Sequence, residues 1–92
     1  MKTVVILIGN SDDKLSQKDW AGFYLHVYEF VSKYGTVHFS GTSIPVAIWQ
    51  NACFVVEVSI LSLSVIKQGL EELSTEYNQD SIAILVGDTE FI

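Results

Sequence analysis

Two segments with apolar residues at helical spacing each lie between strand-like segments, and this order constrains the fold more than any other feature of the chain. The helical patterns run over 17–34 and 62–77. Apolar side chains at steps of three and four residues form one stripe along a helix, whereas continuous or alternating apolar runs indicate strands. The sequence therefore predicts the element order β-α-β-β-α-β.

The expected strands differ in their burial. They cover 3–8, 36–42, 53–59 and 81–86. The first is an unbroken β-branched run ending at Gly9, which is typical of a central strand buried on both faces. The second alternates, which predicts Val37 and Phe39 on one face and His38 and Ser40 on the other.

Both expected helices carry one broad apolar stripe. Ser16 and Asp19 fit a capping box at the start of the first helix, and Gly35 fits its end. Its predicted buried stripe is Trp20, Phe23, Tyr24, Val27, Phe30, Val31 and Tyr34, and its predicted solvent face holds Gly22, His26, Glu29 and Lys33. The stripe of the second helix is Leu63, Ile66, Leu70, Leu73 and Tyr77, with Gly69 weakening the helix slightly.

This order packs most simply as an α+β, ferredoxin-like sandwich. We expect a single domain over 1–92, because 92 residues leave little room for a second core. Its four antiparallel strands take the order 4-1-3-2, with both helices on one face.

The other face of that sheet is expected to be open and partly apolar. His38, Cys53, Val55 and Glu57 are candidates for it. Exposed apolar area costs about 25 cal/mol per Å² in water, so a cover is expected. A second copy is the favoured cover, which predicts a homodimer; the connection 44–50 and a different protein are the alternatives.

Net charge and the length of the apolar runs limit the classes of partner that the protein can bind. The net charge is −6, which opposes direct nucleic-acid binding and suits solubility or docking onto a basic protein, with Glu71, Glu72 and Glu76 on the second helix as the acidic face. No apolar run reaches the roughly 20 residues of a membrane span. The single cysteine forms no internal disulfide, and we expect a cytoplasmic protein.

Two polar segments are expected to meet at one end of the sheet, where the first strand ends and the third begins. The candidate binding residues there are Asn10, Asp12, Asp13, Trp49, Gln50 and Asn51. Amides, carboxylates and an indole suit recognition more than turnover. Two alternatives are Mg²⁺ held by Asp12 and Asp13, and a thiolate at Cys53 activated by His38 and Glu57. We predict no metal, no cofactor and no catalytic residue.

Two resemblances accompany these patterns. The 9–17 segment GNSDDKLSQ followed by Trp20, together with the 49–53 segment WQNAC, is similar to segments of a group of uncharacterised small bacterial proteins. In length, element order and the Tyr34-Gly35 step, the chain also resembles the small CRISPR-associated ferredoxin-like nucleases. That resemblance implies a metal-binding aspartate after the first strand, where this chain has Gly9-Asn10.

Three functions follow from the sequence. The favoured one is a non-catalytic protein-interaction module, a small acidic dimeric domain that docks on a partner, of the immunity or phage counter-defence type. The alternatives are a small metal- or thiol-dependent hydrolase or nuclease, and a dimeric domain that senses a small ligand.

Overall fold

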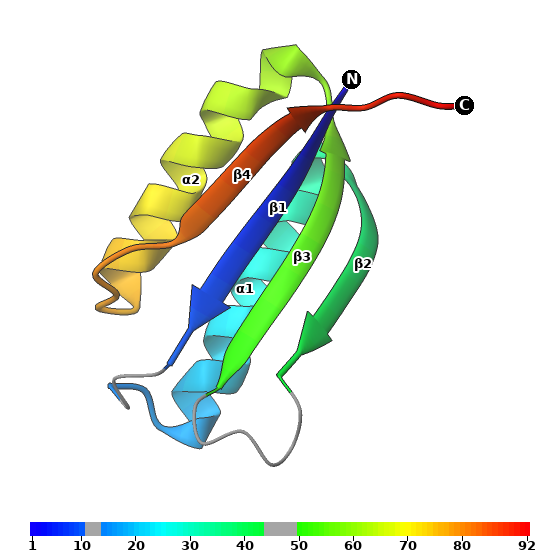
Figure 1. The fold of residues 1–92 in the computed structure, drawn as a ribbon. Coiled ribbons are helices and arrows are strands. Elements are labelled where there is room, and N and C mark those ends of the chain that lie inside the picture. The colour runs from blue at the N-terminus through cyan, green and yellow to red at the C-terminus, as the bar shows by residue number, and fades with distance from the viewer. Residues whose placement is uncertain (11–13, 44–49) are drawn as a thin grey trace.

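The strands and helices follow the predicted order in a computed structural model that describes residues 1–10, 14–43 and 50–92 (Figure 1). The elements are β1 (Lys2–Gly9), α1 (Gln17–Tyr34), β2 (Thr36–Thr42), β3 (Asn51–Val58), a 3-10 turn η1 (Ile60–Ser62), α2 (Leu63–Glu76) and β4 (Ala83–Asp88). The boundaries agree with the expected ones to within two residues, apart from the added turn before α2.

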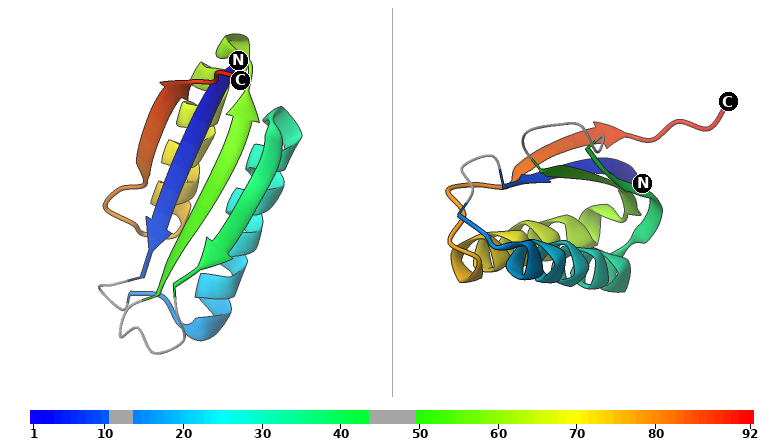
Figure 2. Two further views of the ribbon diagram at one scale, coloured as in Figure 1. Left: turned by 45° about the vertical axis from the view of Figure 1, so that its right-hand side comes forward. Right: turned by 90° about the horizontal axis from the view of Figure 1, so that it is seen from below.

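The strands form one antiparallel sheet in the order β2-β3-β1-β4. Both helices cover the same face of this sheet, as the view from below shows (Figure 2). The predicted α+β, ferredoxin-like sandwich is thereby confirmed. Because β1 and β3 are antiparallel neighbours, the end of β1 and the start of β3 lie together at one end of the sheet.

The core lies between the sheet and the two helices. Ile6 and Phe54 are fully buried on the inner face of the sheet, against Phe23 and Ile66 of the helices. The expectation that β1 is buried on both faces is wrong for the single chain, since Leu7 on the outer face is 42% exposed. Only the inner face of β1 has helices packed against it.

A bulge in β2 changes which side chains face outward. Val37 pairs with Val56, but Phe39 pairs with Val55, so His38 is an extra residue in this strand. The prediction that Phe39 shares a face with Val37 is therefore wrong. Val37 packs against the core, whereas Phe39 is 58% exposed on the outer face. A bulge sets two residues against one and reverses the alternation beyond it.

Close approach of the backbone explains the glycine at the end of α1. Gly35 caps the helix in an extended conformation, with φ −158°. A Cβ at this position would lie 2.7 Å from the carbonyl oxygen of Glu57. Gly35 thus allows the chain to turn directly from α1 into β2 alongside β3.

His26 is exposed, as expected for the outer face of α1, but it also takes part in the contact between the helices. Its Nδ1 meets the hydroxyl of Tyr77 at the end of α2, and Tyr77 stacks on the buried ring of Phe23 at a centroid distance of 4.9 Å. Burial is the main cause that raises the pKa of the Tyr77 hydroxyl, with smaller contributions from Glu76 and Asp19. The phenol therefore stays protonated and available for this contact over an extended pH range.

Candidate functional site

Asn10 organises the end of the sheet where the two predicted polar segments meet. It is only 4% exposed. Its Nδ2 donates to the carbonyl oxygen of Leu15 at 2.9 Å and to Oε1 of Gln50 at 3.0 Å, while its Oδ1 accepts from the amide of Leu15 at 2.9 Å. Its own amide donates to the carbonyl of Gln50. One buried side chain thus joins the segment after β1 to the segment before β3.

Gln50 extends this network to the first turn of α1. Its Nε2 donates to Oε1 of Gln17 at 2.8 Å, and Gln17 donates back to Oε1 of Gln50 at 3.3 Å. Beside it, Gly9 pairs with Asn51, and a Cβ at Gly9 would lie 2.9 Å from Oδ1 of Asn51. The glycine therefore leaves room for the Asn51 side chain at the strand end.

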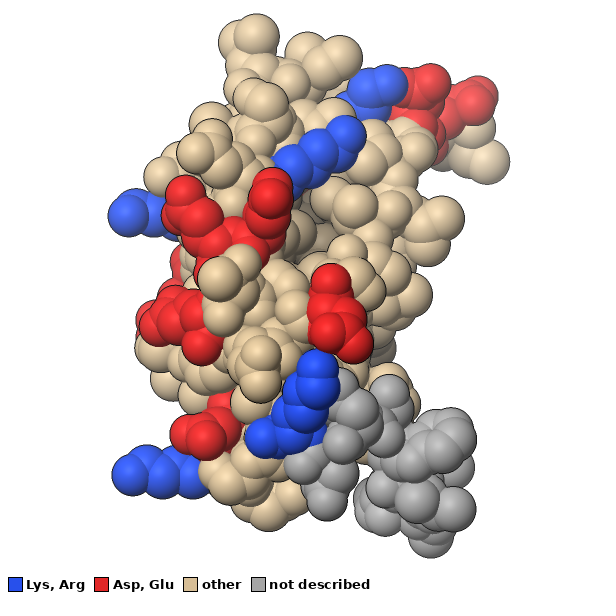
Figure 3. Space-filling view, turned by 90° about the vertical axis from the view of Figure 1, so that its left-hand side faces the viewer, with Lys and Arg blue, Asp and Glu red and all other residues tan. Residues whose placement is uncertain are grey.

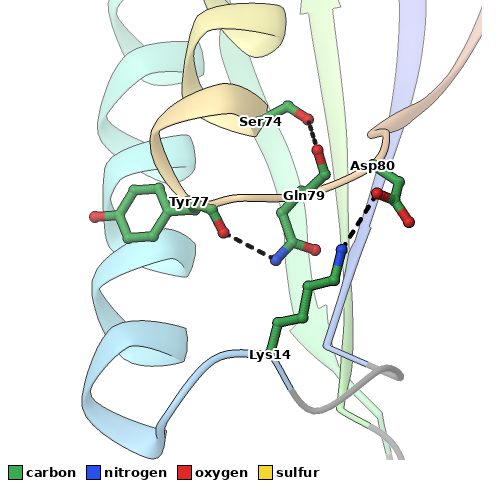
Figure 4. A network of polar contacts seen from close by, with 5 residues as sticks. All are labelled: Lys14, Ser74, Tyr77, Gln79 and Asp80. Atoms are coloured by element: carbon green, nitrogen blue, oxygen red, sulfur yellow. Dashed lines mark hydrogen bonds and ion pairs between the residues drawn. The ribbon is translucent and has the colours of Figure 1, made fainter.

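A third segment, absent from the predicted site, reaches the same end. Asp80 accepts from Lys14 at 3.2 Å, which ties the turn before β4 to the segment after β1 (Figure 4). Ser74 donates to the carbonyl of Gln79, and Gln79 donates to the carbonyl of Tyr77. Asn78 adopts a left-handed backbone conformation, with φ 54°, which lets the chain turn there.

The end of β1, the start of β3 and the turn before β4 line an open polar cleft of about 290 Å³. It is lined by Leu7, Ile8, Gly9, Asn51, Gln79, Asp80, Ser81 and Ala83. The turn before β4 could have been placed here from the sequence, because a turn that precedes a strand antiparallel to β1 lies where β1 ends. The expected site contained Gln50 and Asn51 for this same reason, but it lacked Asp80.

The predicted binding residues divide by role. Asn10, Gln50 and Asn51 lie together, but Asn10 is buried and holds the segments, whereas Asn51 is exposed beside the cleft. Asp12, Asp13 and Trp49 lie outside the described residues. Lys14, Gln17 and Asp80 are the additions that the structure makes to this cluster.

The outer face of the sheet is broadly apolar. Leu7 is 42% exposed, Phe39 58% and Leu85 61%. Val5 pairs with both Val55 and Leu85, which continues the apolar surface across the central strands. We call this surface the open sheet face; it comprises Val5, Leu7, Phe39, Cys53, Val55 and Leu85.

A shallow hollow of about 250 Å³ lies at one side of the open sheet face, between β1, β3 and β2. Leu7, Phe39 and Cys53 are among its lining residues. Gly41 lies under the Phe39 ring, where a Cβ would come within 3.0 Å of Phe39 Cζ. The bulge and this glycine together present an aromatic ring on the face.

The residues proposed for an activated thiolate do not cluster. Nε2 of His38 lies 3.6 Å from Oε1 of Glu57, so this predicted neighbour relation is present. Cys53, however, pairs with Gly41 and Leu7, four residues along β3 from Glu57, which is about 13 Å at strand spacing. Among the described residues no group of three His, Cys, Asp or Glu side chains is arranged to hold a metal ion.

No protein-family model and no curated protein matches this sequence. Within the described part of the chain, neither helix has the length and apolar character needed to cross a membrane. The class of protein is therefore defined by its fold and surfaces: a small ferredoxin-like domain with an open sheet face and a polar cleft at the sheet end.

Proposed function

We propose that this protein is a non-catalytic protein-interaction module that acts as a homodimer joined through the open sheet face. The observation that carries the proposal is the exposure of Leu7, Phe39 and Leu85 on one continuous surface. Contiguous exposed apolar patches on small domains typically mark interaction sites. The acidic remainder of the surface is left to dock on a partner protein.

The charges around the open sheet face favour a second copy as its cover. Its six residues carry no charged side chain, whereas Glu57, whose Oε1 lies 3.6 Å from Nε2 of His38, lies on the same face of β3 toward one end of the sheet. Two copies with net charge −6 each can therefore meet there without opposing like charges at the centre.

The whole outer face of the sheet, of which the open sheet face is the apolar part, is large enough for a modest dimer. Strands of about seven residues at ~3.3 Å and four strands at ~4.8 Å give about 450 Å² in projection on each copy. Burying it on both copies removes on the order of 1,000 Å² from water, the lower end for a specific interface. We therefore expect reversible association.

Sedimentation velocity over an approximately hundredfold concentration range tests this assembly. The natural chain should pass from monomer to dimer, and Phe39→Lys should stay monomeric because a twofold interface buries the new charge twice. Leu25→Lys is the matched control, since Leu25 is 51% exposed on α1, away from the sheet. The open sheet face would be ruled out as the dimer interface if the natural chain stayed monomeric throughout. It would also be ruled out if both variants had equal effects.

The polar cleft at the sheet end favours recognition as the second part of this function. Gly9, Asn51, Gln79, Asp80 and Ser81 are among its lining residues. Amide and hydroxyl groups such as these hold a partner through hydrogen bonds. The resemblance of the 9–17 and 49–53 segments to those of small bacterial proteins supports a paired role for them.

A further inference from the structure

The two edges of the sheet differ in how they are protected. β2 forms one edge and contains the bulge at His38, whereas β4 forms the other and pairs with β1 without a shift in register. Residues 83–87 of β4 contain neither a charged residue nor proline. Bulges, charges and prolines are the usual protection against strand addition. By these criteria β4 is the open edge within the described chain.

A groove runs beside this edge, between α2 and β4. Its volume is about 270 Å³, and its lining is Lys67, Leu70, Glu71, Ser74, Asp80, Ser81, Ile82 and Ile84. Figure 3 shows this side of the molecule, where acidic and basic side chains flank uncharged surface. A strand added at β4 would lie about 4.8 Å from it. Its inward side chains would then point toward Leu70 and Ile84.

The charge around this groove selects among possible occupants. Glu71 and Asp80 line it, and the Asp80 side chain is 91% exposed while paired with Lys14. Lys67 is the one basic residue in the lining. Glu72 and Glu76 add exposed acid on the same helix. A basic segment is attracted here, whereas a second copy brings the same acidic rim and is repelled.

We propose that β4 and this groove bind an extended, basic segment of a partner protein, which adds to the sheet as a fifth strand. Apolar side chains of the segment fill the groove, and its Lys or Arg side chains lie near Glu71 and Asp80. Main-chain hydrogen bonds to β4 supply affinity, and the alternation of side chains supplies specificity. The inference rests on the proposed interaction function and names the class of partner.

The test uses the full chain and a displayed library of random ten-residue peptides. In the recovered peptides, apolar residues and Lys or Arg should share one set of alternate positions, the set that faces the groove, because every second side chain of a strand points to the same face. Each peptide should also slow hydrogen exchange of the amides of β4. In calorimetry, the double variant Glu71→Lys/Asp80→Lys should bind them at least tenfold more weakly. Glu72→Lys/Glu76→Lys is the matched control, because it makes the same change in net charge on residues that do not line the groove and should therefore weaken binding less.

Each other result overturns the proposal. It fails if no peptide is recovered, if the recovered peptides lack this pattern of groove-facing positions, or if the two double variants bind equally. It also fails if Glu71→Lys/Asp80→Lys alters self-association in sedimentation, which would assign the groove to a second copy. The Phe39→Lys chain should bind the same peptides, so the loss of the proposed dimer is distinguishable from the loss of this site.

Discussion

Gly69 of α2 lies directly against the ring of Phe30 in α1: a Cβ built at Gly69 would be only 1.9 Å from Phe30 Cζ. Phe30 packs at the edge of the core and contacts the Tyr34 ring at a centroid distance of 5.2 Å. The glycine that weakens α2 as an isolated helix is thus the position that lets the two helices approach.

Gly69→Ala should therefore destabilise the protein despite the better helix propensity of alanine. Displacing a packed ring costs about 1–3 kcal/mol, against a gain of about 1 kcal/mol in propensity. Gly22→Ala is the control in α1, where a Cβ would lie an ordinary 3.4 Å from the Tyr77 hydroxyl. Urea unfolding should show a lower free energy of unfolding for Gly69→Ala and a higher one for Gly22→Ala. A more stable Gly69→Ala would contradict the packing account.

Asn10→Ala should cost about 2–4 kcal/mol of unfolding free energy. It leaves the buried amide of Leu15 without the acceptor that Asn10 provides, and an unpaired buried group costs about 1–3 kcal/mol. It also removes the donor to Gln50. Gln17→Ala, in the exposed part of the network, should change stability by less than about 0.5 kcal/mol. Equal losses would show that the sheet end does not depend on Asn10.

The ion pair between Lys2 and Asp88 should contribute to stability only above the acid range. The hydrogen bond and charge of Lys2 lower the pKa of Asp88 from its usual value of 3.8. A carboxyl with a lowered pKa stabilises the folded state above that usual value, and the contribution is lost as pH falls through the lowered pKa.

Unfolding of Asp88→Asn, Lys2→Met and the double variant at several pH values measures this contribution. The coupling free energy between positions 2 and 88, obtained from the double-mutant cycle, should be favourable at pH 7 and vanish in acid. A coupling that does not change with pH would mean that the pairing of charges contributes nothing.

Alkylation of Cys53 offers a separate test of the proposed dimer. Cys53 is half-buried on the open sheet face, between Leu7 and Gly41. Iodoacetamide should label it more slowly as the protein concentration rises, because a second copy covers the face. In Phe39→Lys the labelling rate should be independent of concentration. Concentration-independent labelling of the natural chain would instead argue for a different cover.

Short-range patterns were sufficient for most of the fold. Cys53, Val55 and Glu57 were expected on the outer face of β3, and Phe54, Val56 and Val58, which alternate with them, are all buried. Ser16 caps α1 by accepting from the amide of Asp19, as its position indicates. These features depend on burial and hydrogen bonding within a few residues, so the local sequence records them.

The candidate site was only partly predictable for the opposite reason. The meeting of Asn10 with Gln50 followed from the antiparallel order of the central strands. The link from Lys14 to Asp80 joins residues 66 positions apart and also required the placement of the last turn. No local pattern in either segment specifies such a contact.

The sequence by itself determined which segments become strands and helices, and which residues of β3 and most of those of the helices form the core. Which face of β1 is covered depended on the helices packed against it. The tertiary structure decided the outward turn of Phe39, the contact of Gly69 with Phe30, and the meeting of three segments at the sheet end. The physical reason is the separation along the chain between the residues that set each feature. Periodic burial is set by neighbours along the chain, whereas register, bulges and helix approach are set by strands and helices that meet only on folding.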